Sequence, residues 1–555
     1  MIKSPFSSRK PQDFRILLFY PNLHMSALMP QVIGILTALF KREGYTIDLF
    51  DCTFYQDIDI INLGKNANEE RVANRNTSAY SNEEWSKRGG KPKWGIKEDF
   101  VNKVKDFKPD LIAASILEDA YEFCGTLLDA AKKHFTIPIV VGGITPTLSP
   151  NIVMEHPSID MIIQGEGEVA FKELIIALKN KTPLSEVPNL WYKENGNVIR
   201  NKLMRYMDMN ELPYQRLDFW DKKHFLKPYD GVMYKCGFIE MSRGCMHKCH
   251  YCWNRYAQIE LPASDVGKYR RNKSIDTIIR EVKELHKDHN FELIMFSDDN
   301  FLARSFSEME EFYERWRKEI DIPYWHNTCI ETLNEKNIPL LKKSKCVGIA
   351  IGMETGSEFI RRHVLLKGKM TNDMYYEGFK MMAKYKIRST CNVMIGFPGE
   401  FEEDVFETIK MNKKIRAIDQ ELTSCAMSFV TPYAGTVIHN ICLDLGLMEV
   451  NNKPGYKGLC KNITMTKVPV TTNPCMSKER IKDLWFNFTD YIDGKKDIPK
   501  KFLETDPLRK FAEDHPVAKL IYEKFEHYKN GPKNINTKNI SSKNIGLIHS
   551  TVSIS

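Results

Sequence analysis

Three cysteines in one short stretch are the residues of this 555-residue chain best suited to chemistry. Cys245, Cys249 and Cys252 follow the spacing C-x-x-x-C-x-x-C, and Tyr251 stands directly before the last of them. Three thiolates on one loop can bind three irons of a 4Fe–4S cluster, whereas most such clusters take four protein cysteines. The fourth iron would stay open to another ligand, so the spacing predicts a reaction centre rather than an electron store.

A structural zinc site is the alternative interpretation of the same cysteines. Zinc would need a fourth ligand, which His247 or His250 inside the motif could supply. Closed zinc sites usually consist of two ligand pairs, and no second C-x-x-C pair occurs in the sequence. The spacing therefore favours an iron–sulfur cluster.

The cysteine spacing and its aromatic residue resemble the signature of the radical S-adenosylmethionine enzymes. In that family S-adenosylmethionine chelates the open iron, and an electron from the cluster breaks a carbon–sulfur bond to give a 5′-deoxyadenosyl radical. The resemblance implies that Asp298 or Asp299 lies near the methionine amino group and that Glu354, in GMETGS, accepts from the ribose hydroxyls. The full set of S-adenosylmethionine positions implied in this way is Tyr251, Asp298, Asp299, Glu354, Ser357, Gly396, Gly399 and Pro432.

Six predicted strands between residues 233 and 440 must position this chemistry. The first leads into the cysteines, and the others alternate with predicted helices, one of which begins at Ser274 as its N-cap. Most of the polar residues named above follow directly after a strand. Six strands are fewer than the eight of a closed barrel, so the pattern predicts a partial (β/α)6 barrel with its chemistry at the carboxyl ends of the strands.

Five further strands are predicted between residues 14 and 163, ahead of the cysteines. They are short apolar runs that mostly alternate with helices, as in a doubly wound, Rossmann-like parallel sheet, and such sheets bind ligands at the carboxyl ends of their strands. Residues 165–170 also match the dinucleotide pattern G-x-G-x-x-A. However, Glu166 and Glu168 would face the pyrophosphate, and the match follows the fifth strand rather than the first, so no dinucleotide is expected.

The pieces YPN, EGYTIDLFD, KPDLIAAS, VGGITPTLSP and DMIIQGEGE, in this order, resemble the cobalamin-binding domain of cobalamin-dependent radical enzymes. Gly142 and Gly143 would let the backbone approach the buried nucleotide tail of the cofactor, and Thr145 and Thr147 could hydrogen-bond it. The motif D-x-H-x-x-G, whose histidine ligates cobalt in other cobalamin proteins, is absent, so the lower cobalt ligand has no assigned residue. A flavodoxin-like domain without a ligand is the alternative. The cobalamin positions implied by the resemblance are Ser115, Gly142, Gly143, Thr145, Thr147, Gly165 and Gly167.

Length and composition set the remaining expectations. No run approaches the ~18 apolar residues of a membrane helix, and the polar N-terminus lacks a signal-peptide core, so a cytoplasmic protein without a membrane span is expected. The net charge of +8 is mild and no RNA-binding module is visible, so no nucleic-acid partner is expected, whereas a flavodoxin- or ferredoxin-type electron donor is. The expected organisation is a cobalamin-binding domain (1–185), a hairpin and linker (186–232), the radical S-adenosylmethionine barrel (233–440), a helical cap (441–528) and a disordered tail (529–555).

Together the resemblances imply a cobalamin-dependent radical S-adenosylmethionine methyltransferase, which methylates an unactivated carbon of a small-molecule substrate through the deoxyadenosyl radical and methylcobalamin. A ring-forming or rearranging enzyme with the same cofactors, like the anaerobic porphyrin-ring cyclases, is an open alternative. A methylthiotransferase is rejected, because its second cluster would need three N-terminal cysteines and only Cys52 and Cys124 precede residue 236. A non-enzymatic cobalamin or iron–sulfur sensor would need an effector module, which is not recognisable after the barrel. No general base or other catalytic side chain is assigned.

Overall fold

The computed structural model describes residues 10–23, 31–55, 93–230, 232–261, 266–461, 469–504 and 515–529. The long loop predicted over 56–93 and the tail predicted from residue 529 fall outside these ranges, apart from Lys93 and Lys529. No helix within the described ranges is long and apolar enough to cross a membrane.

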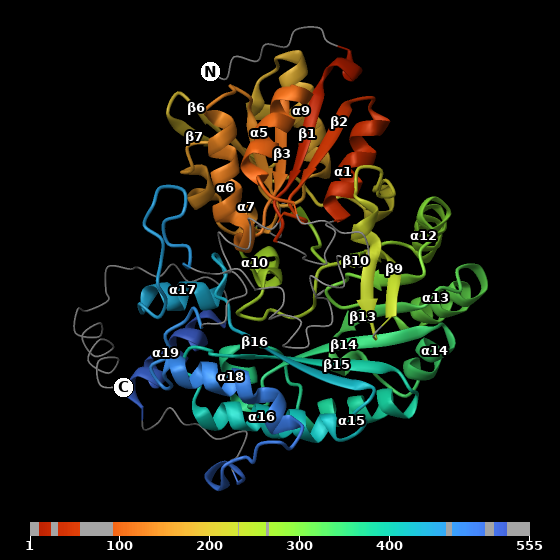
Figure 1. Cartoon of the computed structure of the whole chain (residues 1–555), viewed down its shortest axis with the longest axis vertical. Helices are drawn as coiled ribbons and strands as arrows, with labels where there is room; N and C mark the ends of the chain where they lie inside the picture. The colour runs from red at the N-terminus through yellow and green to blue at the C-terminus, as the bar shows by residue number, and fades with distance from the viewer. Residues whose placement is uncertain are drawn as a thin grey trace.

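A seven-stranded sheet forms the N-terminal part of the molecule (Figure 1). Its strand order is β2-β1-β3-β4-β5-β6-β7, and the first five strands are parallel. The β6–β7 hairpin comes from the segment predicted as hairpin and linker, and it extends the sheet on the β5 side with antiparallel pairing. The strands are β1 (Arg15–Tyr20), β2 (Thr46–Asp51), β3 (Leu111–Ser115), β4 (Ile139–Gly142), β5 (Met161–Ile163), β6 (Leu190–Glu194) and β7 (Asn197–Arg200).

Helices cover both faces of this sheet, because the central strands are apolar on both sides. One face packs against α1 and α9, and the other against α5 and α6. The short helices α7 and α8 follow β4. Their bounds are α1 (Gln31–Arg42), α5 (Ile96–Phe107), α6 (Glu118–Lys132), α7 (Ile144–Leu148), α8 (Pro150–Met154) and α9 (Glu168–Asn180).

A second seven-stranded sheet, curved and open, forms the lower part of the molecule (Figure 1). Its order is β16-β15-β14-β13-β12-β9-β8; six strands are parallel, and β8 pairs antiparallel with β9 at the edge. The six parallel strands are those predicted for the partial barrel, so the predicted fold class is confirmed. The strands are β8 (Leu226–Tyr229), β9 (Val232–Ile239), β12 (Leu293–Phe296), β13 (Tyr324–Thr328), β14 (Cys346–Glu354), β15 (Arg388–Ile395) and β16 (Thr423–Phe429).

Helices line the outer face of the curved sheet. Ser274 caps α12 by accepting from the Thr277 amide at 3.2 Å, as predicted, and Ser305 with Glu308 forms a capping box on α13. The outer-face and C-terminal helices are α12 (Ile275–His289), α13 (Phe306–Glu319), α14 (Asn337–Lys343), α15 (Asn372–Lys384), α16 (Glu402–Arg416), α17 (Val437–Asp444), α18 (Lys478–Ile492) and α19 (Pro516–Tyr528). Along β13 and β15 the helix-facing side chains are buried and the alternate ones are partly exposed, so the concave face of the sheet is open to solvent.

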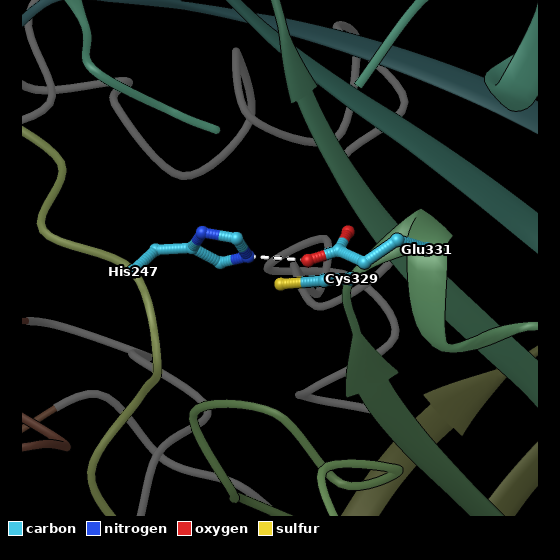
Figure 2. Close-up of side chains that lie close together, drawn as sticks. All are labelled: His247, Cys329 and Glu331. Carbon is cyan, nitrogen blue, oxygen red and sulfur yellow. Dashed lines mark hydrogen bonds and ion pairs between the residues drawn. The ribbon is translucent and has the colours of Figure 1, made fainter. Parts of the chain in front are cut away.

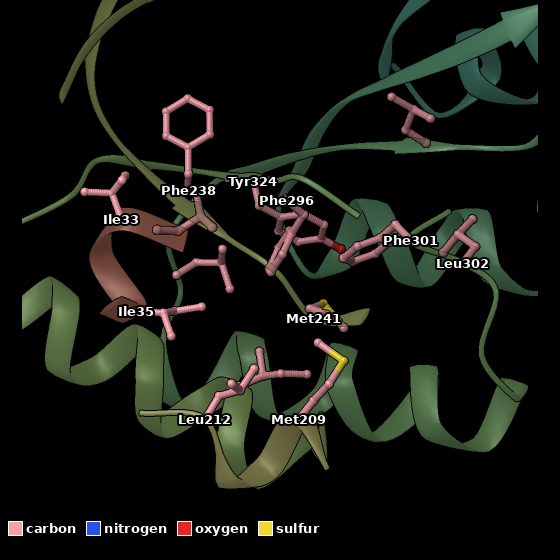
Figure 3. Close-up of a cluster of buried hydrophobic side chains, with 14 of the residues drawn as sticks. Ile33, Ile35, Met209, Leu212, Phe238, Met241, Phe296, Phe301, Leu302 and Tyr324 are labelled. Atoms are coloured by element: carbon pink, nitrogen blue, oxygen red, sulfur yellow. The ribbon is translucent and has the colours of Figure 1, made fainter. Parts of the chain in front are cut away.

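One apolar cluster joins the two sheets. It includes Ile33 and Ile35 of α1, Phe238 of β9, and Phe296 and Tyr324 of the curved sheet (Figure 3). Met209 and Leu212, from the segment between the two sheets, belong to the same cluster. A shared core of this kind fixes how the strand ends of one sheet face those of the other.

Candidate active site at the facing strand ends

The cysteine loop begins at the carboxyl end of β9 and is tied to the end of β12. Asp298 accepts hydrogen bonds from the Met241 amide at 3.2 Å and from the Ser242 hydroxyl. Asp299 accepts from the Gly244 amide at 3.0 Å, where the chain turns with φ +94°. The two carboxylates predicted near the methionine amino group thus also anchor the cluster loop, and contact with S-adenosylmethionine stays a prediction for both.

The three cysteine sulfurs of the loop are close enough for each thiol to affect the pKa of another. The His247 amide donates to the Cys245 sulfur and the Asn254 side chain to the Cys252 sulfur, both at 3.5 Å. Burial raises the pKa of Cys249 to about 12 and that of Cys252 to about 11, so a bound cation is needed to keep them as thiolates at neutral pH. Three sulfurs on one loop with N–H donors fit an iron–sulfur cluster with an open iron.

The two histidines of the motif have other partners. His247 pairs through Nε2 with Glu331, which follows β13, and Cys329 lies beside them (Figure 2). His250 is 1% exposed, hydrogen-bonds the Val364 carbonyl through Nδ1 at 2.8 Å and stacks on Phe525 of α19. His250 is thus engaged elsewhere, whereas the His247 ring nitrogen lies within 4.8 Å of the Cys329 sulfur and a Glu331 oxygen. That the three cysteines are the ligands of the cluster stays a prediction.

Glu354 ends β14 in an unusual conformation. Its φ is +68°, in the left-handed region that non-glycine residues seldom adopt, and the β14–β15 register shifts just before it. This irregularity aims the carboxylate at the cysteine loop, where Oε1 accepts from the Tyr251 hydroxyl at 3.0 Å. Two predicted S-adenosylmethionine positions, Tyr251 and Glu354, are therefore in direct contact.

Lys367 completes this group and was not predicted from the sequence. Its Nζ lies 2.7 Å from Glu354 Oε1 and 3.2 Å from the Tyr251 hydroxyl, and the residue is 7% exposed. Burial works against the charge, but Glu354 outweighs it and holds the pKa of Lys367 well above its usual value. A lysine in a loop, far from any motif, gives no signal in the sequence that it will reach a strand end.

The other predicted S-adenosylmethionine positions are held by local contacts. Ser357 is buried and accepts from the Ile360 amide at 3.3 Å. Gly396 and Gly399 adopt φ of +93° and +79° in the loop after β15, which α18 and α19 cover. Pro432 is buried in the loop after β16. All of these lie at or after the carboxyl ends of β14, β15 and β16, as predicted.

The predicted cobalamin positions lie together at the carboxyl ends of β3, β4 and β5. Ser115 ends β3 and Gly142 ends β4. A Cβ on Gly143 would come within 2.8 Å of the Ile116 backbone, whereas a Cβ on Gly165 would meet no described atom within 4 Å. A backbone without side chains beside open space fits a large planar cofactor.

The two threonines of this region serve the loops themselves. The Thr147 hydroxyl donates to the Gly143 carbonyl at 2.7 Å and accepts from the Gly165 amide at 3.0 Å, so it joins the β4 and β5 loops. Thr145 is 2% exposed, and its amide bonds to the Ile116 carbonyl at 3.4 Å. Gly167 precedes α9 as its N-cap. Their contact with cobalamin stays a prediction.

A half-buried ion-pair cluster connects the cobalamin-side loop to the cysteine loop. Arg243, two residues before Cys245, contacts Glu166 at 3.1 Å and Glu168 at 2.8 Å. Arg271 pairs with Glu166 as well, at 3.1 Å for Nη1 to Oε2. The two carboxylates that argued against a dinucleotide thus bind arginines of the barrel domain. Sequence spacing could not reveal these pairs, because the partners are 75 to 105 residues apart in the sequence.

A second contact joins the two parts at the end of β16. Glu118, at the start of α6, accepts from the Ala434 amide at 2.8 Å, and the Tyr433 hydroxyl donates to Asp119 at 3.1 Å. The other Glu118 oxygen is buried without a partner among the described residues. Burial raises the pKa of Glu118 to about 8.

Lys227 in β8 is a further buried lysine that the sequence did not reveal. It is 4% exposed, its ammonium lies 5.8 Å from the centre of the Phe238 ring, and no described group hydrogen-bonds it. Burial lowers the pKa of Lys227 to about 7. The Cys236 thiol and the Asp51 carboxylate act in the opposite direction on this pKa.

Family profiles match the two regions separately. Residues 239–411 match the radical SAM superfamily and residues 85–175 match the B12 binding domain. The first match covers the cysteine loop and the strands β12 to β15 of the curved sheet, and the second covers the strand-end glycines of the first sheet.

Individual proteins are similar to this chain over more than half of its length. An uncharacterised methyltransferase of Pyrococcus horikoshii is 29% identical over 64% of this chain and 74% of its own length. An anaerobic magnesium-protoporphyrin IX monomethyl ester cyclase of Synechocystis is 23% identical over 60% of this chain and 64% of its own length. The fold matches the structure of the radical S-adenosylmethionine methyltransferase TsrM of Kitasatospora setae, with cobalamin and a 4Fe–4S cluster bound, over 97% of this chain and 99% of that one (TM-score 0.59, 12% identity).

Proposed function

We propose that this chain, a cobalamin-dependent radical S-adenosylmethionine enzyme, transfers a methyl group to an unactivated carbon of a small-molecule substrate. The observation that carries the proposal is the pairing of Arg243 with Glu166 and Glu168. It ties the cobalamin-side loop to the residue two places before the first cluster cysteine. Two cofactor sites that share one boundary can act on one substrate between them.

The residues of the chain would divide the work as follows. Cys245, Cys249 and Cys252 would hold the cluster, and Tyr251 and Glu354 would orient the nucleoside of S-adenosylmethionine beside it. When bound, the cluster with S-adenosylmethionine supplies a deoxyadenosyl radical, and cobalamin supplies the methyl group. The partly exposed concave face of β13 and β15 would receive the substrate.

An oxidative cyclase with the same cofactors is the second candidate. The similarity to the Synechocystis cyclase favours it, because that alignment also spans more than half of this chain. The two reactions differ in whether a methyl group leaves S-adenosylmethionine, so their products separate them.

The test is a product analysis on anaerobically purified, cluster-reconstituted protein. The protein receives S-adenosylmethionine, a strong reductant and hydroxocobalamin, and 5′-deoxyadenosine and S-adenosylhomocysteine are quantified together. A Cys249→Ala variant is the control, because it removes one predicted iron ligand.

Formation of both products, with deoxyadenosine lost in Cys249→Ala, is the result expected of a radical methyltransferase. Deoxyadenosine alone, with cobalamin bound, would favour the cyclase. Absence of both products from a protein that binds no iron would contradict both candidates.

A further inference from the structure

One indole and two side-chain amides lie close together on the concave face of the curved sheet. Trp325 and Asn327 alternate with buried residues along β13, and Asn392 alternates with buried residues along β15. Successive side chains of a strand point to opposite faces, and the buried set faces the outer helices. The other three side chains therefore lie on the concave face, where each is half-buried.

The strand between them, β14, presents small residues to the same face. Trp325 is paired in register with Gly348, and Asn327 is the next residue of β13 on that face. Asn392 is paired in register with Gly352. A Cβ on Gly348 would come within 2.8 Å of the Trp325 ring carbon Cδ1, so the indole lies over β14. Two strand spacings, about 10 Å, separate β13 from β15 across these small residues.

This group of residues adjoins the predicted nucleoside site. A Cβ on Gly352 would collide with the Glu354 carboxylate, which is the group predicted to accept from the ribose hydroxyls. Asn392 is the register partner of Gly352 on the neighbouring strand. A molecule bound by the two amides and the indole would therefore have one edge towards the predicted site of S-adenosylmethionine.

The two amides and the indole have no partner in the part of the chain that the structure describes. None of the described residues hydrogen-bonds the side chain of Asn327, Asn392 or Trp325, and no described ring packs on the indole. Other polar groups of the same face are satisfied, since the Thr390 and Ser424 hydroxyls bond each other at 2.9 Å. A face that pairs its hydroxyls and leaves two amides and an indole unpaired offers those three groups to a ligand.

The charged side chains of the three central strands are already paired. Glu354 and Arg388 are the only Asp, Glu, Lys or Arg residues in β13, β14 and β15. Glu354 pairs with Lys367 at 2.7 Å, and Arg388 pairs with Asp230. These strands therefore present hydrogen-bonding groups without a spare charge.

We propose that Trp325, Asn327 and Asn392 bind the substrate, and that the part they bind is a flat, uncharged group with hydrogen-bond donors and acceptors, such as a heteroaromatic ring. The inference rests on the proposed function and deepens it by naming a class of substrate. The face of an indole suits stacking on a flat ring, and each amide offers both donors and an acceptor.

The same residues disfavour two other classes of substrate. A hydrocarbon such as a lipid chain would leave both amides without partners, and sites built to form hydrogen bonds reject such ligands strongly. A carboxylate or phosphate would lose water of hydration without meeting a free cation on these strands. A neutral heteroaromatic ring satisfies the indole and the amides together.

The experiment measures how three probes bind to the reconstituted protein, by equilibrium dialysis without S-adenosylmethionine. Quinoline-4-carboxamide is flat and neutral and carries an amide. Quinoline-4-carboxylate has nearly the same shape but is charged, and cyclohexanecarboxamide keeps the amide but is not flat. The wild type should bind quinoline-4-carboxamide about tenfold more tightly than either of the other probes.

Variants test the three residues one at a time. Trp325→Leu, Asn327→Ala and Asn392→Ala should each weaken binding of quinoline-4-carboxamide by about threefold to tenfold. Trp325→Phe keeps a flat ring and should stay close to the wild type. Trp94→Leu and Asn102→Ala are the matched controls, because Trp94 is exposed just before α5 and Asn102 is exposed within it, beside the first sheet. Both controls should bind as the wild type does.

A wild type that binds the three probes equally, or that prefers the carboxylate, would overturn the inference. Unchanged binding of quinoline-4-carboxamide in Trp325→Leu and in both asparagine variants would overturn it as well. If Trp325→Leu does not fold, the two asparagine variants decide.

Failure of the proposed function is a separate result, because the dialysis needs no turnover. Iron content and release of 5′-deoxyadenosine are measured on the same preparations. A wild type without a cluster would contradict the proposed function, whereas a wild type with its cluster and no preference among the probes would contradict only the class of substrate.

Discussion

The two sets of strand ends that face each other in this molecule are built from different residues. The barrel side presents charged side chains that pair with one another, such as Glu354 with Lys367. The first sheet presents glycines and hydroxyls, such as Gly143, Gly165 and Thr147, and the Thr147 hydroxyl joins its β4 and β5 loops. The barrel side has to bind a metal cluster and a charged cosubstrate, whereas the first sheet has to make room for a bulky ring system.

This difference predicts which kind of substitution damages each site. On the barrel side, removing a side chain leaves a buried charge without its partner, which is costly. On the first sheet, adding a side chain obstructs an approach of the backbone. Truncations should therefore damage one site and enlargements the other.

Lys367→Met should have the largest effect on the barrel side. It leaves Glu354 buried beside the Tyr251 hydroxyl without a cation, and breaking a buried pair in this way costs about 3–5 kcal/mol. Thermal unfolding of the reconstituted protein measures the loss, and S-adenosylmethionine binding measures its effect on the site.

Lys380→Met is the matched control, because Lys380 also pairs with a glutamate, Glu377 at 2.9 Å, but on the surface of α15. Its midpoint of unfolding should stay at the wild-type value. Equal shifts in the two variants would mean that the barrel-side pair is no more important than a surface pair.

Arg243→Ala should come next, because it separates the two sites from each other. It removes the cation of Glu168 and Glu240, whereas Glu166 keeps Arg271, and the expected cost is about 3 kcal/mol. Thermal unfolding measures that cost. We also expect the ratio of S-adenosylhomocysteine to 5′-deoxyadenosine to fall, since the cobalamin-side loop would no longer be held against the cluster loop.

Arg315→Ala is the matched control for Arg243→Ala. Arg315 also contacts three carboxylates, Asp276, Glu311 and Glu319, but at the exposed surface of α13. Exposed pairs contribute little, so stability and product ratio should stay near wild type. A product ratio that is unchanged in Arg243→Ala would contradict the role of the Arg243 ion pairs in coupling the two cofactor sites.

The sequence predicted the parts of this architecture that have a local signal. Strands and helices alternate with clear periods, so both sheets and the cap of α12 at Ser274 could be predicted. The three cysteines could be predicted because their spacing on one loop is itself the signal. The glycines at strand ends could be predicted as well, because each one indicates a feature of the backbone at its own position and does not depend on a distant partner.

The residues that were missed are those whose role depends on a partner far along the chain. Lys367 and Cys329 lie in ordinary sequence surroundings, and only the fold brings them to the strand ends. Glu166 and Glu168 were noticed, but their arginine partners lie in another domain. Pairings of this kind follow from tertiary packing, which no local pattern records.

Glu118 is an apparent exception to the contrast between the two sites, because it is a buried carboxyl group on the side of the first sheet. Glu118→Gln tests whether this carboxyl group is charged. Burial raises its pKa from 4.5 to about 8, so the folded protein binds a proton that the unfolded chain releases above pH 4.5. The contribution to stability is therefore complete below pH 4.5 and is lost as the pH rises towards 8. Between pH 5 and pH 7 this loss is on the order of 2 kcal/mol.

Glutamine has the same shape and cannot ionise, so Glu118→Gln should lose this part of the pH dependence. Thermal unfolding of both proteins from pH 5 to pH 8 measures it, and the variant should gain on the wild type as the pH rises. Parallel curves would show that Glu118 is ionised in the folded protein, and the first sheet would then share the charged character of the barrel side.

Gly165→Ala should have the smallest effect on stability and the most selective effect on binding. Gly165 has φ +83°, where alanine costs about 1 kcal/mol, and a Cβ there meets no described atom within 4 Å. Gly196, in the β6–β7 hairpin, has φ +79° and the same open surroundings, so Gly196→Ala carries the same backbone cost away from the strand ends. Both variants should unfold at the same midpoint. Only Gly165→Ala should weaken hydroxocobalamin binding, by about tenfold or more, because its added methyl group would lie between the backbone and the cofactor. Equilibrium dialysis of the three proteins decides it, because equal affinities would mean that the cofactor does not approach this glycine and that open space there has another use.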